Sequence, residues 1–412
     1  MPPLADGVAF AALVALLVTA VRHPSGRVEL AVGAVSVTAV AACGLLDAEL
    51  VAETLRHLGP VVLFLASILV VADLCAAAGL FTWAADRIVR LGRGRAVPVF
   101  TGTLLVAAAI TATLSLDATV VLLTPVVTTA ALALRIPHRP GASACLRMAN
   151  SASLLLPVSN LTNLLAMPHL SLGFAGFAAV MAPVWAVVLV VEYAGLRWLH
   201  RRDLADPGQH RRSTSPVPMP VVPVVVVGAM LAGFAVTSPL GVEPGVVSSV
   251  AAVALLAWAW RRGLAGPRRA LAAAHPSFAG FVLSLGLVVA TLGDGPLGAD
   301  LRSLLPDGTG FASLLLLAVL ATGLAALVTN LSATLLLVPM AAPLGTAAVL
   351  AALIGLTVGS GLTWTGSLAN LLWRRSLVRQ GLPPSTREFH RVSLLLTPVS
   401  LVAAVATLSL VV

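Results

Sequence analysis

Residues 159–165 read SNLTNLL, and residues 366–372 read GSLANLL. A second pair of segments repeats in the same way, because residues 115–125 align without gaps on residues 329–339 and both end in Leu-Leu-x-Pro. Each half of the chain therefore carries the same two short polar motifs in the same order. This arrangement indicates an internal repeat, and repeats that flank interrupted apolar segments are typical of transporter architectures.

The sequence around these motifs is strongly apolar. Of the 412 residues, 59% are hydrophobic and 10% are charged, with a mean hydropathy of +1.02, whereas soluble domains carry roughly 25% charged residues. Runs such as 58–80 and 174–196 hold about 20 mostly apolar residues, enough to cross a hydrocarbon core of about 30 Å. The composition predicts a chain that crosses a lipid bilayer several times.

The net charge of +9 comes from arginine, because the chain has no lysine. The arginines lie in short loops beside apolar runs, which is the pattern of membrane orientation signals and argues against nucleic-acid binding. Residues 1–20 lack a basic leader and an Ala-x-Ala cleavage site, so we expect a retained first span. The predicted location is the cytoplasmic (inner) membrane, with several passes.

The arginines also predict the topology of the two halves. Residues 96–134 begin after Arg95 and end at Arg135, so both ends face the cytoplasm and the segment is predicted to be a re-entrant hairpin. A pair of full spans is the alternative. Residues 310–348 follow acidic Asp307 and are predicted to form the matching hairpin from the external side.

The predicted fold is an all-α polytopic membrane protein with two inverted-topology repeats. We expect about ten transmembrane spans, two re-entrant hairpins and two interrupted helices. The first predicted repeat covers residues 1–199, with its hairpin at about 96–134 and its broken helix at about 143–167. A cytoplasmic linker is predicted over 200–217. The second repeat covers 218–412, with its hairpin at about 310–348 and its broken helix at about 350–373.

Four polar breaks interrupt the apolar background, at residues 113–119, 157–163, 329–334 and 359–370. Ser, Thr and Asn cap broken helix ends, whose free N–H groups bind oxyanions, and their oxygens can coordinate Na⁺ or bind a neutral hydroxide. Such side chains can also bond back to their own helix. The symmetric placement of four clusters favours a binding site.

Asp117 is the most informative single residue, because no arginine lies near it in the sequence. A lone carboxylate at membrane depth is costly, which makes Asp117 the candidate proton carrier, with a structural cap as the alternative. Glu192 and Asp73 are secondary candidates, since we expect both near cytoplasmic ends with water and arginine within reach. His169 is expected at the external mouth, as a solvated side chain or a proton relay.

The three cysteines, Cys43, Cys75 and Cys145, lie far apart without Cys-x-x-Cys spacing. We expect them to pack as apolar residues. A thiolate site for trivalent arsenic or antimony is the alternative, because soft metalloids favour sulfur.

The motifs resemble those of the arsenite and antimonite efflux permeases of the ion transporter superfamily, which also includes divalent-anion/sodium symporters and some sodium/proton antiporters. The similar segments are SLDAT at 115–119, NSASLLLPVSNLTN at 150–163 and GSLANLLW at 366–373. The resemblance implies a core of hairpins and broken helices that moves against the remaining helices. Leu116 replaces the usual Asn of the first hairpin, and Thr329-Asn330 stands where a paired Asn is common.

Together these features predict a secondary active transporter for proton-coupled efflux of arsenite or antimonite. Alternatives on the same fold are a sodium-coupled symporter of dicarboxylate or another anion and a sodium/proton antiporter; a passive channel is a further alternative. No catalytic motif occurs, so we predict no enzyme activity, no catalytic residue and no resident metal.

We expect no cofactor, with a proton or sodium gradient as the energy source. Expected partners are a small inorganic oxyanion or weak acid and the lipid bilayer, and a homodimer and a soluble ATPase stay open. The predicted substrate or ion site contains Ser115, Asp117, Thr119, Ser159, Asn160, Thr162, Asn163, Thr329, Asn330, Ser332, Thr334, Thr365, Gly366, Ser367 and Asn370.

Overall fold

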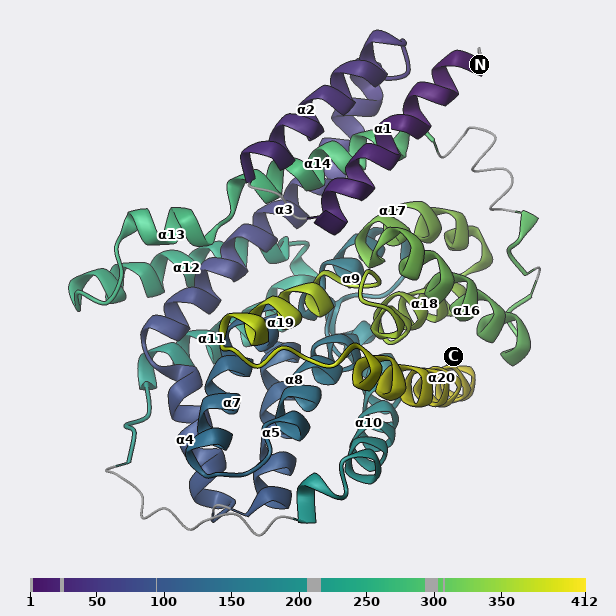
Figure 1. Cartoon of the computed structure of the whole chain (residues 1–412). Coiled ribbons are helices and arrows are strands. Elements are labelled where there is room, and N and C mark those ends of the chain that lie inside the picture. Colours follow the sequence, from purple (N-terminus) through teal and green to yellow (C-terminus); the bar gives the residue numbers. More distant parts are fainter. Residues whose placement is uncertain (1–2, 23–25, 94, 206–215, 293–302, 307) are drawn as a thin grey trace.

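The computed structural model describes all residues except 1–2, 23–25, 94, 206–215, 293–302 and 307 (Figure 1). Across the described residues every regular element is a helix. Part of the predicted linker at 200–217 and the acidic residue Asp307 therefore lie outside the described residues.

The first half contains long apolar helices and a set of short ones. In chain order these are α1 (Pro3–Arg22), α2 (Gly26–Ala42), α3 (Ala48–Ala77), α4 (Leu80–Leu91), α5 (Ala96–Thr113), α6 (Leu116–Ala118), the π-helical η1 (Thr119–Leu123), α7 (Thr124–Ala133), α8 (Arg139–Ser151), the 3₁₀ turns η2 (Ala152–Leu154) and η3 (Pro157–Ser159), α9 (Leu161–Ala166), η4 (Met167–His169) and α10 (Phe174–Leu199).

The second half follows the same plan. It contains α11 (Val221–Thr237), α12 (Pro244–Arg261), α13 (Pro267–Ala273), α14 (Pro276–Ala290), α16 (Phe311–Val328), α17 (Asn330–Ala341), η7 (Ala342–Leu344), α18 (Thr346–Thr357), η8 (Gly359–Leu362), α19 (Leu368–Arg379) and α20 (Thr386–Val411). The 3₁₀ turns η5 (Asp203–Ala205) and η6 (Ser238–Leu240) lie in loops.

Within the described ranges, nine helical segments are long and apolar enough to cross a membrane, and shorter apolar helices accompany them. The predicted all-helical polytopic class is confirmed. A bilayer favours this class because each helix satisfies its own backbone hydrogen bonds where no water is available.

The broken helices extend beyond the predicted ranges. The first begins at Arg139 rather than at about residue 143, because Pro140 occupies the first helical turn, where its missing N–H costs nothing. The second begins at Thr346, after Gly345 takes a φ of 101° that ends the preceding segment, and its second part continues to Arg379.

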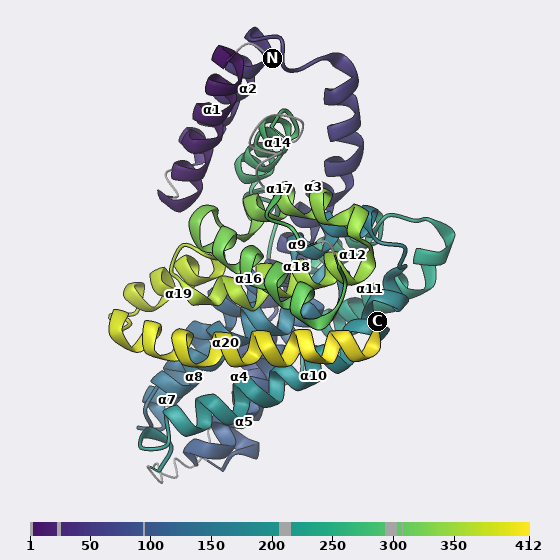
Figure 2. The ribbon, with the colours of Figure 1, turned by 90° about the vertical axis from the view of Figure 1, so that its right-hand side faces the viewer.

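The helices divide into a flank and a centre. At one end of the molecule α1 packs against α2, and α14 packs against α1, α2 and α3 (Figures 1 and 2). The short helix α9 lies in the centre and contacts α17, the helix α19 lies at one side of this region, and the packed pair α10 and α20 closes the side opposite α14. This arrangement places the four polar breaks next to one another.

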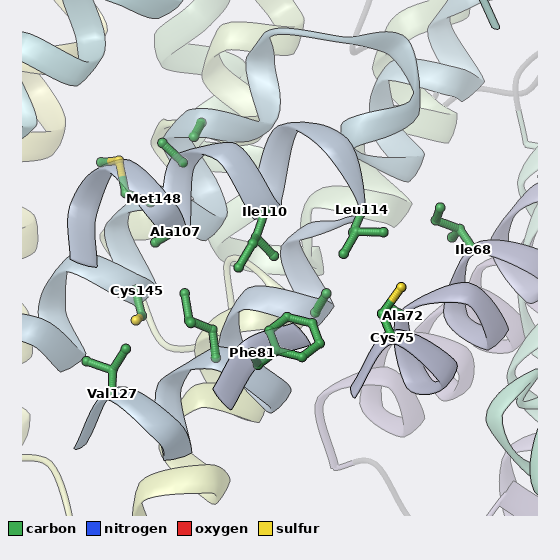
Figure 3. Packing of buried hydrophobic residues seen from close by; sticks show 14 of the residues in the cluster. Ile68, Ala72, Cys75, Phe81, Ala107, Ile110, Leu114, Val127, Cys145 and Met148 are labelled. Atoms are coloured by element: carbon green, nitrogen blue, oxygen red, sulfur yellow. The ribbon is translucent and has the colours of Figure 1, made fainter. Parts of the chain in front are cut away.

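The buried cysteines belong to one apolar cluster, which also contains residues from both arms of the first hairpin. In Figure 3 the side chains of Phe81 and Ile110 lie between Cys145 and Cys75. Cys43 is exposed, and among the described residues no group of three or more His, Cys, Asp and Glu side chains could hold a metal ion. The structure therefore gathers no thiolate site, and Cys75 and Cys145 fill space as apolar side chains.

Candidate functional site

A central cavity of about 80 Å³ lies where both hairpin tips meet both broken helices. One wall is apolar and comes from α3 and α14, including Phe64, Ile68 and Phe281. The opposite wall is polar and contains nine of the fifteen predicted site residues: Ser115, Asp117, Ser159, Asn160, Thr162, Thr329, Asn330, Ser332 and Ser367. The cavity has room for a few water molecules or a small polar solute.

Two asparagines hold the breaks open in the same way. The Asn163 amide donates to the carbonyl oxygens of Ser153 at 2.8 Å and Leu156 at 3.0 Å. The Asn370 amide donates to the equivalent carbonyls, those of Ser360 at 2.9 Å and Thr363 at 2.7 Å. Unwound backbone would otherwise leave buried carbonyls without partners, so these two side chains make the interruption stable at membrane depth.

The second part of each broken helix begins at a side-chain cap. Asn160 accepts from the backbone N–H of Thr162 at 3.2 Å, and Ser367 accepts from that of Ala369 at 3.1 Å. Both residues are extended at the cap, as N-cap residues usually are. The remaining N–H groups of the 12-residue helix α19 begin beside Ser367 at the cavity wall.

Each hairpin is tied to the break of its own half. The Ser159 hydroxyl donates to the carbonyl of Ala112 at 2.8 Å, and the Thr365 hydroxyl donates to the carbonyl of Ala326 at 3.0 Å. In the second half the N–H of Asn330 also donates to the carbonyl of Gly366 at 3.0 Å. Tip and break therefore form one unit in each half.

Asp117 lies at the tip of the first hairpin, two residues after Ser115, which caps α6 by accepting from Ala118 N–H at 3.1 Å. The side chain is half-buried, and its Oδ1 is buried without a hydrogen-bond partner among the described residues. It borders both the central cavity and a larger cavity of about 540 Å³, the inner vestibule. An acceptor oxygen without a partner at this place is available to a proton or to a polar solute.

The inner vestibule carries charge. Glu29, Asp73, His275, Arg375 and Arg379 line it together with Asp117. Asp73 forms a two-point ion pair with Arg269, with contacts of 2.6 and 3.0 Å. By the positive-inside rule, the arginines Arg375 and Arg379 predict that this vestibule faces the cytoplasm.

A second cavity of about 540 Å³, the outer vestibule, reaches the second hairpin from the other side. Glu53, His57, His169 and Thr334 line it. Burial lowers the pKa of His169, and the neighbouring His57 acts in the same direction. His169 is therefore mostly neutral at pH 7 and adds no fixed positive charge to this mouth.

Six predicted residues do not line the central cavity. Asn163, Asn370, Thr365 and Gly366 form the breaks, and Thr119 meets the hydroxyl of Thr111 at 2.7 Å inside the first hairpin. The Thr334 hydroxyl donates to the carbonyl of Asn330 at 2.6 Å. These residues shape the backbone around the cavity.

Glu192 has an arginine within reach, as predicted, but not water, and its partner Arg147 was not singled out from the sequence. Glu192 is fully buried and is paired with Arg147 of α8, so water is not within its reach. The signal was present, because Arg147 is an arginine inside a predicted broken helix, where an ionisable side chain marks a functional candidate. The other arginines lie mainly beside apolar runs, and this pattern hides the buried position of Arg147 in the sequence.

Comparison with known proteins agrees with this architecture. A sequence model described as CitMHS, citrate transporter, matches residues 5–359. The chain belongs to this citrate transporter family. Two relatives are named arsenical pump membrane protein. The one from Yersinia enterocolitica is 29% identical to this chain over 373 residues, and the one from Escherichia coli strain K12 is 29% identical over 365 residues. Each alignment covers 84% of this chain and 84% of the relative.

A solved structure of another transporter has a fold similar to that of this chain. The crystal structure of the Alcanivorax borkumensis YdaH transporter, described as having an unusual topology, matches with a TM-score of 0.58 over 89% of both chains at 16% identity. The predicted resemblance to arsenical permeases is confirmed by the curated relatives, and the chain is a multi-pass membrane transporter.

Proposed function

We propose that this transporter exports trivalent arsenic or antimony, as the hydroxide, across the cytoplasmic membrane in exchange for protons. The observation that carries the proposal is the position of Asp117, whose buried Oδ1 has no partner among the described residues and lies between the central cavity and the inner vestibule. A carboxyl group placed there can take a proton when the substrate leaves and release it when the substrate enters.

The lining of the central cavity supports a neutral, hydroxyl-rich cargo. Among the described residues that form it, none is cationic, and the polar groups are hydroxyls, amides and one carboxylate. A tricarboxylate such as citrate would bring several negative charges next to Asp117 without a guanidinium to pair with them. A trihydroxide of arsenic is small and can donate its hydroxyl protons to Asp117 and to the Asn and Ser oxygens.

The relatives support the same cargo. Their printed name is arsenical pump membrane protein, and the alignment covers most of both chains. The family description names citrate, so citrate and dicarboxylate uptake with sodium is the competing outcome that an experiment must include.

The test is arsenite accumulation in cells that lack their own arsenite exporter. We expect the natural chain to lower accumulation, and we expect Asp117→Asn or a protonophore to abolish that effect. Glu49→Gln, at an exposed first-turn position of α3, is the matched control and should behave as the natural chain does.

Membrane abundance of each variant is measured on the same cells. If the natural chain reaches the membrane and leaves arsenite accumulation unchanged, the arsenical proposal is wrong. Sodium-dependent citrate uptake by the same cells would then identify the competing activity.

A further inference from the structure

A charged network is buried between the first broken helix and the packed pair α10 and α20. Arg147 is 2% exposed and Glu192 is fully buried. Arg147 Nε donates to Glu192 Oε2 at 2.9 Å, and Nη2 donates to Oε1. Ser400 donates to Glu192 Oε1 at 2.8 Å, and Arg147 Nη1 donates to Thr397 Oγ1 at 3.0 Å. The network therefore ties α8 to both helices of this pair.

Stability alone is a weak reason for such a network. Removing two charges from water costs several kcal/mol each, and replacing a buried ion pair by apolar side chains of similar size is often neutral or stabilising. Ser and Thr partners satisfy part of the remaining hydrogen-bonding capacity. The contacts that the pair makes outside its own helices are therefore the informative ones.

The guanidinium of Arg147 lies directly against the second break. A Cβ placed on Gly361 would lie 2.7 Å from Arg147 Nη1, so only glycine fits there while the ion pair holds the guanidinium in place. One turn further along α8, Asn150 donates to the side-chain oxygen of Asn370 at 2.8 Å. Asn370 in turn binds the carbonyl of Ser360. Two residues of the first half therefore contact the second break: Arg147 lies against Gly361, and Asn150 binds Asn370.

Among the described residues, the second half makes no equivalent side-chain hydrogen bond to the first break. In the repeat alignment Ile354 and Thr357 stand where Arg147 and Asn150 stand, and the Thr357 hydroxyl bonds back to its own helix at Leu353. The Oδ1 of Asn163, equivalent to that of Asn370, is buried and has no hydrogen-bond partner in the described part of the chain. Helices of the second half pack against the first break, but among the described residues none of their side chains hydrogen-bonds to Asn163 as Asn150 does to Asn370.

We propose that Arg147, held by Glu192, is a positioning residue that fixes the second break so that Ser367 and the start of α19 face the central cavity. Arg147 does not line that cavity and acts through Gly361, while Asn150 on the same helix holds Asn370. The expected effect on transport rests on the proposed function, because it concerns the affinity of the transporter for arsenite. Loosening the break should weaken binding while the carboxylate of Asp117 stays in place.

The first experiment needs no substrate. Cys43→Ser removes the exposed thiol, and Leu368→Cys or Leu161→Cys then places a single accessible thiol at equivalent positions of the two breaks, both of which line the cavity. A membrane-impermeant maleimide is added and labelling rates are compared with and without Arg147→Leu/Glu192→Leu. We expect the rate at position 368 to change by about fivefold or more, and the rate at position 161 to stay within about twofold.

Gly361→Ala provides a second variant with both charges intact. Its methyl group should displace the guanidinium and change the labelling rate at position 368 in the same direction. Combined with the Arg147→Leu/Glu192→Leu change it should add little, because both changes act on one contact. Independent, multiplicative effects would overturn the proposal, and so would equal changes at positions 161 and 368.

Transport kinetics separate positioning from a structural role. In everted vesicles that transport arsenite, we expect Arg147→Leu/Glu192→Leu to raise KM about tenfold and to leave the maximal rate per folded molecule within about twofold. A fall in folded protein with unchanged KM would show a purely structural pair and would overturn the inference. Failure of the natural chain to transport arsenite would reject the cargo and leave the labelling result to decide the inference.

Discussion

The tip of the first hairpin carries Asp117, whereas the aligned position of the second hairpin carries Leu331. Around these positions the two halves are alike in geometry, since Asn163 and Asn370 each bind two carbonyls at equivalent places of their breaks. The backbone that frames the cavity therefore repeats, and the charge does not. The comparison indicates that the repeat supplies the frame, whereas a single carboxylate at one tip makes the two halves different.

The largest effect should follow from moving the carboxylate between the hairpins. In Asp117→Leu/Leu331→Asp the charge leaves the inner vestibule and arises next to the other tip, so we expect the arsenite transport rate in everted vesicles to fall about a hundredfold or more. Leu331→Asn, which changes polarity at the second tip without moving the charge, should stay within about threefold. A transport rate close to that of the natural chain in the exchanged variant would show that the position of the carboxylate does not matter.

The second effect compares the two asparagines of the breaks. Asn370→Ala should lower the free energy of unfolding by about 2 to 5 kcal/mol, because two buried carbonyls and Asn150 lose their partner. Asn163→Ala should cost about 1 kcal/mol less, because the Oδ1 of Asn163 has no partner to lose among the described residues. Thermal unfolding of the purified protein in detergent measures both, and equal losses would remove this difference between the halves.

A smaller effect is expected from Gly366→Ala and Ser159→Ala, which change equivalent positions of the two breaks. A Cβ on Gly366 would lie 2.4 Å from the carbonyl oxygen of Ser360, so Gly366→Ala must push the break open and should cost about 1 to 3 kcal/mol. The equivalent residue Ser159 already has a side chain, and Ser159→Ala removes its bond to the Ala112 carbonyl and the longer bond that its Oγ accepts from Leu156 N–H, together worth about 1 to 2 kcal/mol. The same unfolding assay ranks the two, and a harmless Gly366→Ala would mean that the second break is looser than the structure shows.

The smallest change in activity should come from cysteines placed in the two vestibules. Val121 borders the inner vestibule and Leu335, its partner in the repeat, borders the outer one. With Cys43→Ser, we expect an impermeant maleimide to label Val121→Cys from the cytoplasmic face and Leu335→Cys from the external face, with transport within about twofold of the natural chain. Labelling of both from one face would contradict the inverted arrangement.

Much of this frame was predictable from the sequence. Polar motifs that interrupt apolar runs locate broken helices, because only capped or solvated backbone can exist there. Nine of the fifteen predicted residues line the cavity. The sequence could not separate these from residues that hold the frame, because Asn160 and Asn163 are three positions apart in one motif, and only the fold decides which of them faces the cavity.

Contacts between distant parts of the chain were not predictable in this way. Arg147 and Glu192 lie in different helices, and no local pattern relates them. The apolar wall from α3 and α14 was also missed, because Phe64 and Phe281 are ordinary residues of apolar spans until the fold brings them together. The sequence predicts the polar chemistry of a site better than the shape of its apolar wall.

Among the described residues that line the central cavity, Asp117 is the only one that can carry a full charge, and under the proposed exchange of substrate for protons this would determine how transport responds to membrane voltage. When Asp117 is ionised, moving the cavity across the membrane moves one elementary charge, and each 100 mV then changes the energy of that step by about 2.3 kcal/mol. When a proton occupies Asp117, the same movement is electrically silent. The membrane potential would therefore act on one half of the transport cycle only, and current recordings could time the two halves separately.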